Sequence, residues 1–73
     1  MKAELRKTLR PREVEYLTLV AKGLRRREIA DVMGIATSTV GSHHKEALQT
    51  LGARTAAEAV YQAFQKGIFK VIE

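Results

Sequence analysis

The fold is decided by residues 26–51, which read RREIADVMGIATSTVGSHHKEALQTL. Apolar residues recur at helical spacing on both sides of Gly34, so two helices separated by only a few residues are expected. The first of these, from about Arg26 to Met33, is expected to turn four apolar side chains inward: Ile29, Ala30, Val32 and Met33. The second carries its own apolar stripe and ends at Gly52; the stripe consists of Val40, Ala47, Leu48 and Leu51.

The corner between these two helices has the residue types of a helix-turn-helix. Ala30 is small, so the second helix can cross close above it. Gly34 supplies the left-handed backbone of a tight turn, a conformation that costs most other residues about 1 kcal/mol or more. Ile35 and Val40 are placed to hold the helices together. This combination predicts a unit whose second helix enters the major groove of DNA, although bundles without a DNA function use such corners too.

Working outward, one further helix is expected on each side. The preceding helix opens near Arg10, because Pro11 suits a first helical turn, and its apolar stripe is Val14, Leu17, Val20 and Ala21. Thr55 is expected to cap a last helix that runs towards Gly67. The sequence therefore predicts an all-α, four-helix domain over residues 9–67, between a basic tail (1–8) and a C-terminal tail (68–73).

The composition favours nucleic acid as the partner. The 73 residues include 13 Lys and Arg against 8 Asp and Glu, and a small domain with this net charge of +5 attracts polyanions. Without cysteine, neither a disulfide nor a thiolate metal site is available. His43 and His44 point about 100° apart on a helix and have no third ligand at useful spacing. No enzyme, metal or cofactor is therefore expected, and with no membrane-spanning stretch the expected location is the cytoplasm.

Seven short stretches carry a resemblance to a known family. They are Pro11–Leu17, Ala21–Leu24, Arg27–Ala30, Met33–Ile35, Thr39–Val40 with His43, Leu51–Gly52 and Ala57–Val60. In these stretches the chain resembles the DNA-binding domain of the LuxR/FixJ family, also called GerE-type. The resemblance implies a bacterial transcription regulator whose third helix reads the major groove and whose fourth helix forms a homodimer contact. It also implies an inverted-repeat site on double-stranded DNA.

The expected site residues follow from this resemblance and from the outward face of the third helix. The base-facing residues are Ser38, Gly41, Ser42 and Lys45. The phosphate contacts are Arg25, Arg26, Arg27, Thr37, Thr39 and His43. The dimer contact is made by Ala57, Tyr61 and Phe64.

The chain departs from the family mainly by losing charge and caps. Gly41 stands where a lysine often points into the groove, and Thr50 and Ala56 replace other common cations. The usual capping hydroxyls are also replaced, at Arg10, Arg25 and Ala36, so a hydroxyl of Thr37, Ser38 or Thr39 is expected to cap the third helix. We therefore expect few base contacts. Most of the hold on DNA is expected to come from contacts between the phosphate backbone and the arginines beside the third helix.

Two alternatives remain open from the sequence. A helix-turn-helix like that of sigma factor region 4 would place the chain beside RNA polymerase, although Ala57–Val60 followed by Lys66 argues against it. A protein-interaction module that has lost DNA binding, and that acts on RNA polymerase or another regulator, is consistent with Gly41, Thr50 and Ala56.

Overall fold

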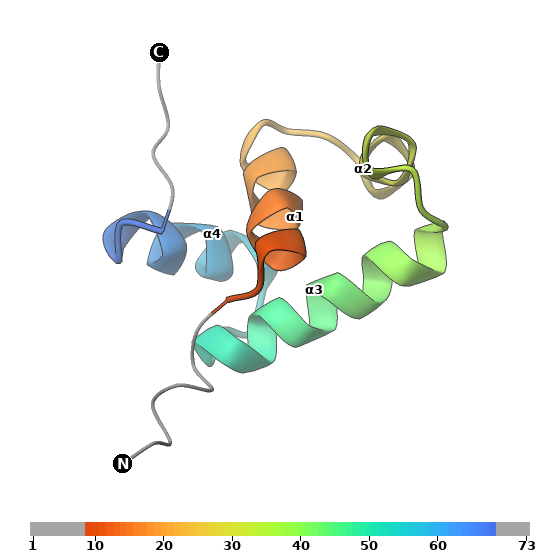
Figure 1. Cartoon of the computed structure of the whole chain (residues 1–73). Helices are drawn as coiled ribbons and strands as arrows, with labels where there is room; N and C mark the ends of the chain where they lie inside the picture. The colour runs from red at the N-terminus through yellow and green to blue at the C-terminus, as the bar shows by residue number, and fades with distance from the viewer. Residues whose placement is uncertain (1–8, 69–73) are drawn as a thin grey trace.

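The computed structural model describes residues 9–68, which form helices and no strand. The helices are α1 (Pro11–Ala21), α2 (Arg26–Met33), α3 (Thr37–Leu51) and α4 (Ala56–Gln65). In Figure 1, α1 stands between α4 and α2, and α3 runs beneath all three. α1 and α3 each pack against every other helix, whereas α2 and α4 do not touch in the described part of the chain. The predicted all-α, four-helix architecture is confirmed.

The two predicted tails fall almost entirely outside the description. Residues 1–8, the expected basic tail, lie outside the described residues, and so does the expected C-terminal tail except for its first residue. That residue, Ile68, is half-buried and packs against the core.

The core forms where α1, α3 and α4 meet. Its completely buried side chains are Leu17 of α1, Val40 and Ala47 of α3, and Ala59 and Ala63 of α4. Ala59 and Ala63 are four residues apart and so share one face of α4, where their small size lets α4 lie close to its neighbours. One face of α3 is therefore held in the core from Val40 to its C-terminal end, and its opposite face is left to solvent.

Two details of the predicted apolar stripes are wrong. Ala21 is exposed because it is the last residue of α1, and Tyr16 and Leu19 are buried from that helix instead. Val32, expected to face inward, is 59% exposed. The eight-residue α2 packs only against α1 and α3 among the described helices. The face of α2 turned towards them carries Ile29, Ala30 and Met33, and Val32 lies outside that face.

Glutamates take over part of the capping of α1 and α2. Neither Arg10 nor Arg25 caps its helix with its side chain. Instead, the Arg10 amide donates to Oε1 of Glu13 at 3.1 Å, and the Arg25 amide donates to Oε1 of Glu28 at 2.7 Å. These bonds form one half of a capping box, since the guanidinium has no acceptor to complete the other half. The predicted cap of α4 is confirmed, because the Glu58 amide donates to Oγ1 of Thr55 at 3.1 Å.

α3 begins without a side-chain cap. Its N-cap residue is Ala36, so Thr37 is already the first helical residue. The expectation that a hydroxyl of Thr37, Ser38 or Thr39 would cap this helix is therefore wrong, because all three lie inside its first turn.

The corner between α2 and α3 depends on the backbone of Gly34. Its φ of 69° and ψ of 37° are left-handed, as predicted. The turn is closed by two backbone hydrogen bonds. The Ile35 amide donates to the carbonyl of Ala30 at 3.0 Å, and the Gly34 amide donates to the backbone carbonyl of Asp31 at 3.3 Å. Ile35 is half-buried against the core. α2 therefore stops at Met33, and α3 can begin at Thr37.

Replacing Gly34 should show how much free energy the left-handed backbone of this turn costs a residue that has a Cβ. Gly34→Ala is expected to lower the free energy of unfolding by about 1–2 kcal/mol, because a Cβ disfavours the left-handed backbone. No heavy atom lies within 4 Å of the added methyl group, so a steric clash would not contribute. Denaturant titration measures the effect. Gly41→Ala, in the interior of α3, is the matched control and should stabilise by up to about 1 kcal/mol. Unchanged stability of Gly34→Ala would contradict a conformational requirement at the corner.

Candidate nucleic-acid interface

The outer face of α3 presents small and cationic side chains in a line. Ser38, Ser42 and Lys45 are all exposed, and their spacing of four and three residues puts them on one stripe of the helix. We call these three residues the α3 stripe. The Ser42 hydroxyl donates to the carbonyl of Ser38 at 3.4 Å, so it stays close to the helix surface. The stripe is flat except for the long side chain of Lys45.

Gly41, also expected to face DNA, lies at the edge of this stripe and is half-buried. The group beside it is the guanidinium of Arg26. A Cβ built on Gly41 would lie 3.4 Å from Nη1 of Arg26, so the arginine reaches from the start of α2 to the backbone of α3. The sequence placed both residues at the DNA surface but gave no sign that they touch each other.

The remaining expected phosphate contacts lie at the starts of α2 and α3. Arg25 and Arg27 are exposed at the first turn of α2, and Thr37 and Thr39 are exposed at the first turn of α3. The first N–H groups of a helix have no partner within that helix. Because no side chain caps α3, its N-terminal amides remain available to an anion such as a phosphate.

His43 is less accessible than the sequence analysis expected. Its side chain is half-buried, and its Nδ1 is buried without a hydrogen-bond partner among residues 9–68. A phosphate could therefore be contacted only through its Nε2.

A partly buried pair, Tyr16 of α1 and His44 of α3, was missed by the sequence analysis. The Tyr16 hydroxyl and Nδ1 of His44 share a hydrogen bond of 2.7 Å, and the two rings meet edge to face with centroids 5.8 Å apart. Burial raises the pKa of the Tyr16 hydroxyl, and the positive charge of Arg26 opposes this effect. The pair fixes the rotation of α3 against α1. No local pattern could have revealed it, since the partners are 28 residues apart.

Arg12 provides a second tie that the sequence did not reveal. Its Nη2 donates to the carbonyl of Met33 at 3.3 Å, and its Nη1 pairs with Oε1 of Glu15 at 3.1 Å. Arg12 therefore joins α1 to the last residue of α2, next to the corner. Its acceptor is a backbone carbonyl, which no side-chain pattern identifies.

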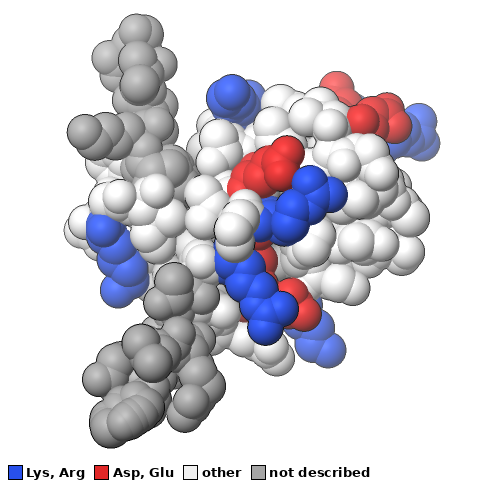
Figure 2. All heavy atoms as spheres, in the orientation of Figure 1, with Lys and Arg blue, Asp and Glu red and all other residues white. Residues whose placement is uncertain are grey.

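The face of the molecule seen in Figure 2 does not carry one continuous basic field. In the view of Figure 2, Lys and Arg side chains are separated by acidic and uncharged ones. An anionic partner would therefore be held on this face by particular cations.

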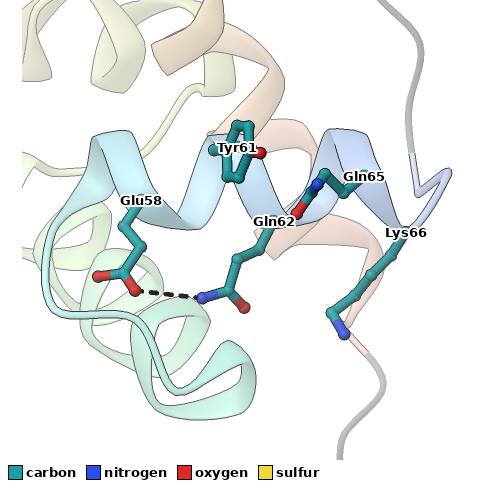
Figure 3. A pocket seen from close by; sticks show the side chains of 5 residues that line it. All are labelled: Glu58, Tyr61, Gln62, Gln65 and Lys66. Carbon is teal, nitrogen blue, oxygen red and sulfur yellow. Dashed lines mark hydrogen bonds between the residues drawn. The ribbon is translucent and has the colours of Figure 1, made fainter.

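The predicted dimer residues are exposed on the outer face of α4. Tyr61 is 59% and Phe64 is 52% exposed, and Ala57 lies on the same side of the helix. A shallow hollow adjoins them, and Figure 3 shows the residues that line it: Glu58, Tyr61, Gln62, Gln65 and Lys66. Nε2 of Gln62 donates to Oε2 of Glu58 at 3.4 Å across the hollow. Two large apolar side chains are thus left uncovered on a helix that does not touch α2.

Neither a metal centre nor a membrane span is found in the part of the chain that the structure describes. Over residues 9–68, no three His, Asp or Glu side chains come together as ligands would. None of the helices in that range has the length and apolar character needed to cross a bilayer.

Comparison with known proteins identifies the family. The model of the bacterial regulatory proteins of the luxR family matches residues 7–63. The chain belongs to this family. Membership confirms the predicted resemblance and makes the chain a DNA-binding regulatory domain and not an enzyme. The corner at Gly34 and the exposed α3 stripe both lie within the matched range.

Response regulators from staphylococci are among the relatives of this luxR-family domain. The response regulator protein VraR of Staphylococcus aureus, of Staphylococcus saprophyticus and of Staphylococcus epidermidis is 38% identical to it over 69 residues. The matched region covers 94% of this chain but 33% of each relative, so the chain spans about a third of the length of these proteins. No solved structure was found to match the chain.

The Tyr16–His44 hydrogen bond should make the free energy of unfolding depend on pH in the alkaline range. The pKa of the Tyr16 hydroxyl is raised above its ordinary value of 10.0 in the folded chain. The neutral hydroxyl therefore gives its full stabilisation of the fold below pH 10, and this stabilisation is lost as the pH rises through the raised pKa. Tyr16→Phe should cost about 1 kcal/mol at pH 7, where the hydrogen bond is lost, and this difference from the wild type should narrow by pH 11. Denaturant titrations at both pH values measure it. Tyr61→Phe, at a tyrosine that is 59% exposed, is the control for removing a hydroxyl and should cost less at pH 7. A constant difference for Tyr16→Phe would contradict the burial of a neutral hydroxyl.

Proposed function

We propose that this domain binds double-stranded DNA sequence-specifically and regulates transcription, with α3 lying in the major groove. The observation that carries the proposal is the α3 stripe of Ser38, Ser42 and Lys45, exposed on a helix whose other face is held in the core. An α-helix fits the width of the major groove, and small side chains on its outer face allow it to lie close to the bases. The family and the site of action on DNA are consistent with a bacterial cytoplasmic protein.

The proposed contacts divide into base-facing and phosphate-facing groups. Lys45 is the long cation of the α3 stripe, and a lysine can donate to O6 and N7 of guanine. Ser38 and Ser42 offer short donors to either side of it. The phosphate contacts are proposed for Arg25, Arg27, Thr37, Thr39, the Nε2 of His43 and the uncapped amides of α3. Arg26 is not among them, because its guanidinium lies beside Gly41 of α3.

Selection from random duplex DNA followed by salt titration tests this proposal. About five phosphate contacts should give a slope of log K against log salt near −4 to −5. Replacing both Arg25 and Arg27 by alanine should flatten that slope by about 2 and weaken all sequences alike. A chain that shows no duplex binding and no salt dependence would contradict the proposal.

Lys45 should determine sequence preference more than general affinity. Lys45→Ala is expected to cost about 1–3 kcal/mol on the selected duplex and to remove the preference at one base pair. Fluorescence anisotropy with the selected duplex and with singly altered duplexes measures both effects. Glu46→Ala, at the exposed neighbouring position, is the control and should keep the preference. An equal loss on every duplex would make Lys45 a phosphate contact.

The domain is further proposed to form a homodimer through α4. The support is the exposure of Tyr61 and Phe64 beside Ala57, because large apolar side chains left uncovered on a small domain favour association. Two-fold symmetry would then give an inverted-repeat site with half-sites about one turn of DNA apart.

The dimer proposal predicts that changes on α4 weaken binding to the inverted repeat without weakening binding to one half-site. Tyr61→Glu together with Phe64→Glu should leave affinity for one half-site within about twofold of the wild type, because both side chains are exposed on α4 and lie outside the proposed DNA contacts of α2 and α3. It should abolish the cooperative gain on the inverted repeat, as measured by sedimentation and anisotropy. Val32→Glu, which also replaces an exposed apolar residue, is the control and should not alter self-association. Unchanged cooperativity in the α4 variant would contradict this interface.

A second candidate function is contact with RNA polymerase or another regulator. The observation that favours it is the 59% exposure of Val32 on the outer side of α2, away from the α4 hollow. Loss of transcriptional output in Val32→Glu without loss of DNA binding would support this function in addition to DNA binding.

A further inference from the structure

The guanidinium of Arg26 in α2 lies beside Gly41 of α3, at a point that the turn itself does not reach. Arg26 is the first residue of α2, and its side chain is exposed. Its Nη1 lies 3.4 Å from the place where a Cβ of Gly41 would stand. This distance places the guanidinium beside the backbone of α3.

Position 41 borders the α3 stripe. It is four residues before Lys45 and three residues after Ser38, so it adjoins both on the helix surface. A guanidinium held over Gly41 consequently lies beside Lys45 and Ser38. Its neighbour Arg27 points about 100° away around α2 and does not share this direction.

We infer that Arg26 is a base-reading residue and not a phosphate contact, and that its guanidinium passes over Gly41 to a guanine in the major groove. The inference rests on the proposed function, in which α3 lies in that groove. The guanidinium offers two parallel donors that match O6 and N7 of guanine, which makes this pairing the commonest specific arginine contact. Base recognition on this domain is therefore shared between Lys45 of α3 and Arg26 of α2.

Gly41 is the residue that makes this route possible. A methyl group at position 41 would only touch Nη1 at ordinary contact distance, so alanine is compatible with the arginine. A longer side chain would occupy the space that the guanidinium now fills. An uncharged, unbranched side chain such as methionine would therefore displace Arg26 without adding charge and without disfavouring the helix.

The test compares four variants of the 73-residue chain on the selected duplex and on duplexes with each base pair altered in turn. Arg26→Ala should lose about 10- to 100-fold in discrimination at one guanine. Arg26→Lys should lose most of that discrimination but keep the salt slope, because it keeps the charge without the paired donors. Gly41→Met should lose discrimination at the same base pair, and Glu46→Ala, the control at an exposed position outside the proposed contacts, should retain it. Circular dichroism and denaturant titration show that each variant is folded.

The variants also separate this inference from the proposed function. Adding Gly41→Met to Arg26→Ala should cause no further loss at that guanine, because both changes remove the same contact. If Arg26→Ala weakens every duplex equally and Gly41→Met keeps the guanine preference, the inference is overturned and DNA binding stands. If the wild type shows no preference among duplexes, the proposed function itself fails, and this inference fails with it.

Discussion

The left-handed backbone at Gly34 is the constraint from which the rest of the domain follows. It lets the Ile35 amide bond back to the carbonyl of Ala30, which ends α2 and turns the chain within three residues. α3 then starts close enough to α2 for Val40 to be buried beneath the corner. Because that face of α3 is held in the core, the opposite face must carry Ser38, Ser42 and Lys45. The exposed α3 stripe is thus a consequence of the turn.

Two side-chain hydrogen bonds also connect the corner to α1. Arg12 joins the last residue of α2 to α1, and Tyr16 joins α1 to α3 through His44. The guanidinium of Arg26 lies beside Gly41. The two hydrogen bonds restrict how α2 and α3 can rotate against α1, which favours one relative arrangement of the cations and the stripe. A pre-arranged surface loses little conformational entropy on binding, which matters for a domain with so few charged groups on α3.

The parts of this structure that could be predicted from the sequence are those with local causes. Gly34 and Pro11 mark helix ends through their own backbone preferences, and the predicted bounds of α2 and the predicted end of α3 before Gly52 agree with the structure. Val32 was misplaced because its apolar character says nothing about how much of a short helix its neighbours cover. The hydrogen bonds of Arg12 and Tyr16 and the place of Arg26 beside Gly41 were missed for the same reason. Their partners lie on other helices, and no spacing along the chain encodes them.

The same division applies to the candidate site. The exposed positions of α3 follow from its apolar stripe, and the sequence identified them together with the arginines of α2. The role of Gly41 did not follow from the sequence, because the space left by its missing side chain matters only through the Arg26 guanidinium that lies beside it. No spacing along the chain shows that these two residues are neighbours. Glu13 and Glu28 likewise replace part of the missing hydroxyl caps by accepting the N-cap amides, which only the structure reveals.

The central claim is that α3 and the start of α2 form one DNA-binding surface. The most direct measurement is a nuclear magnetic resonance titration of the ¹⁵N-labelled chain with its selected duplex, followed at each backbone amide. The account predicts shifts concentrated at residues 25–27 and 37–45 that weaken together as salt is raised. Shifts confined to α4, or none at these residues while the duplex is bound, would contradict it.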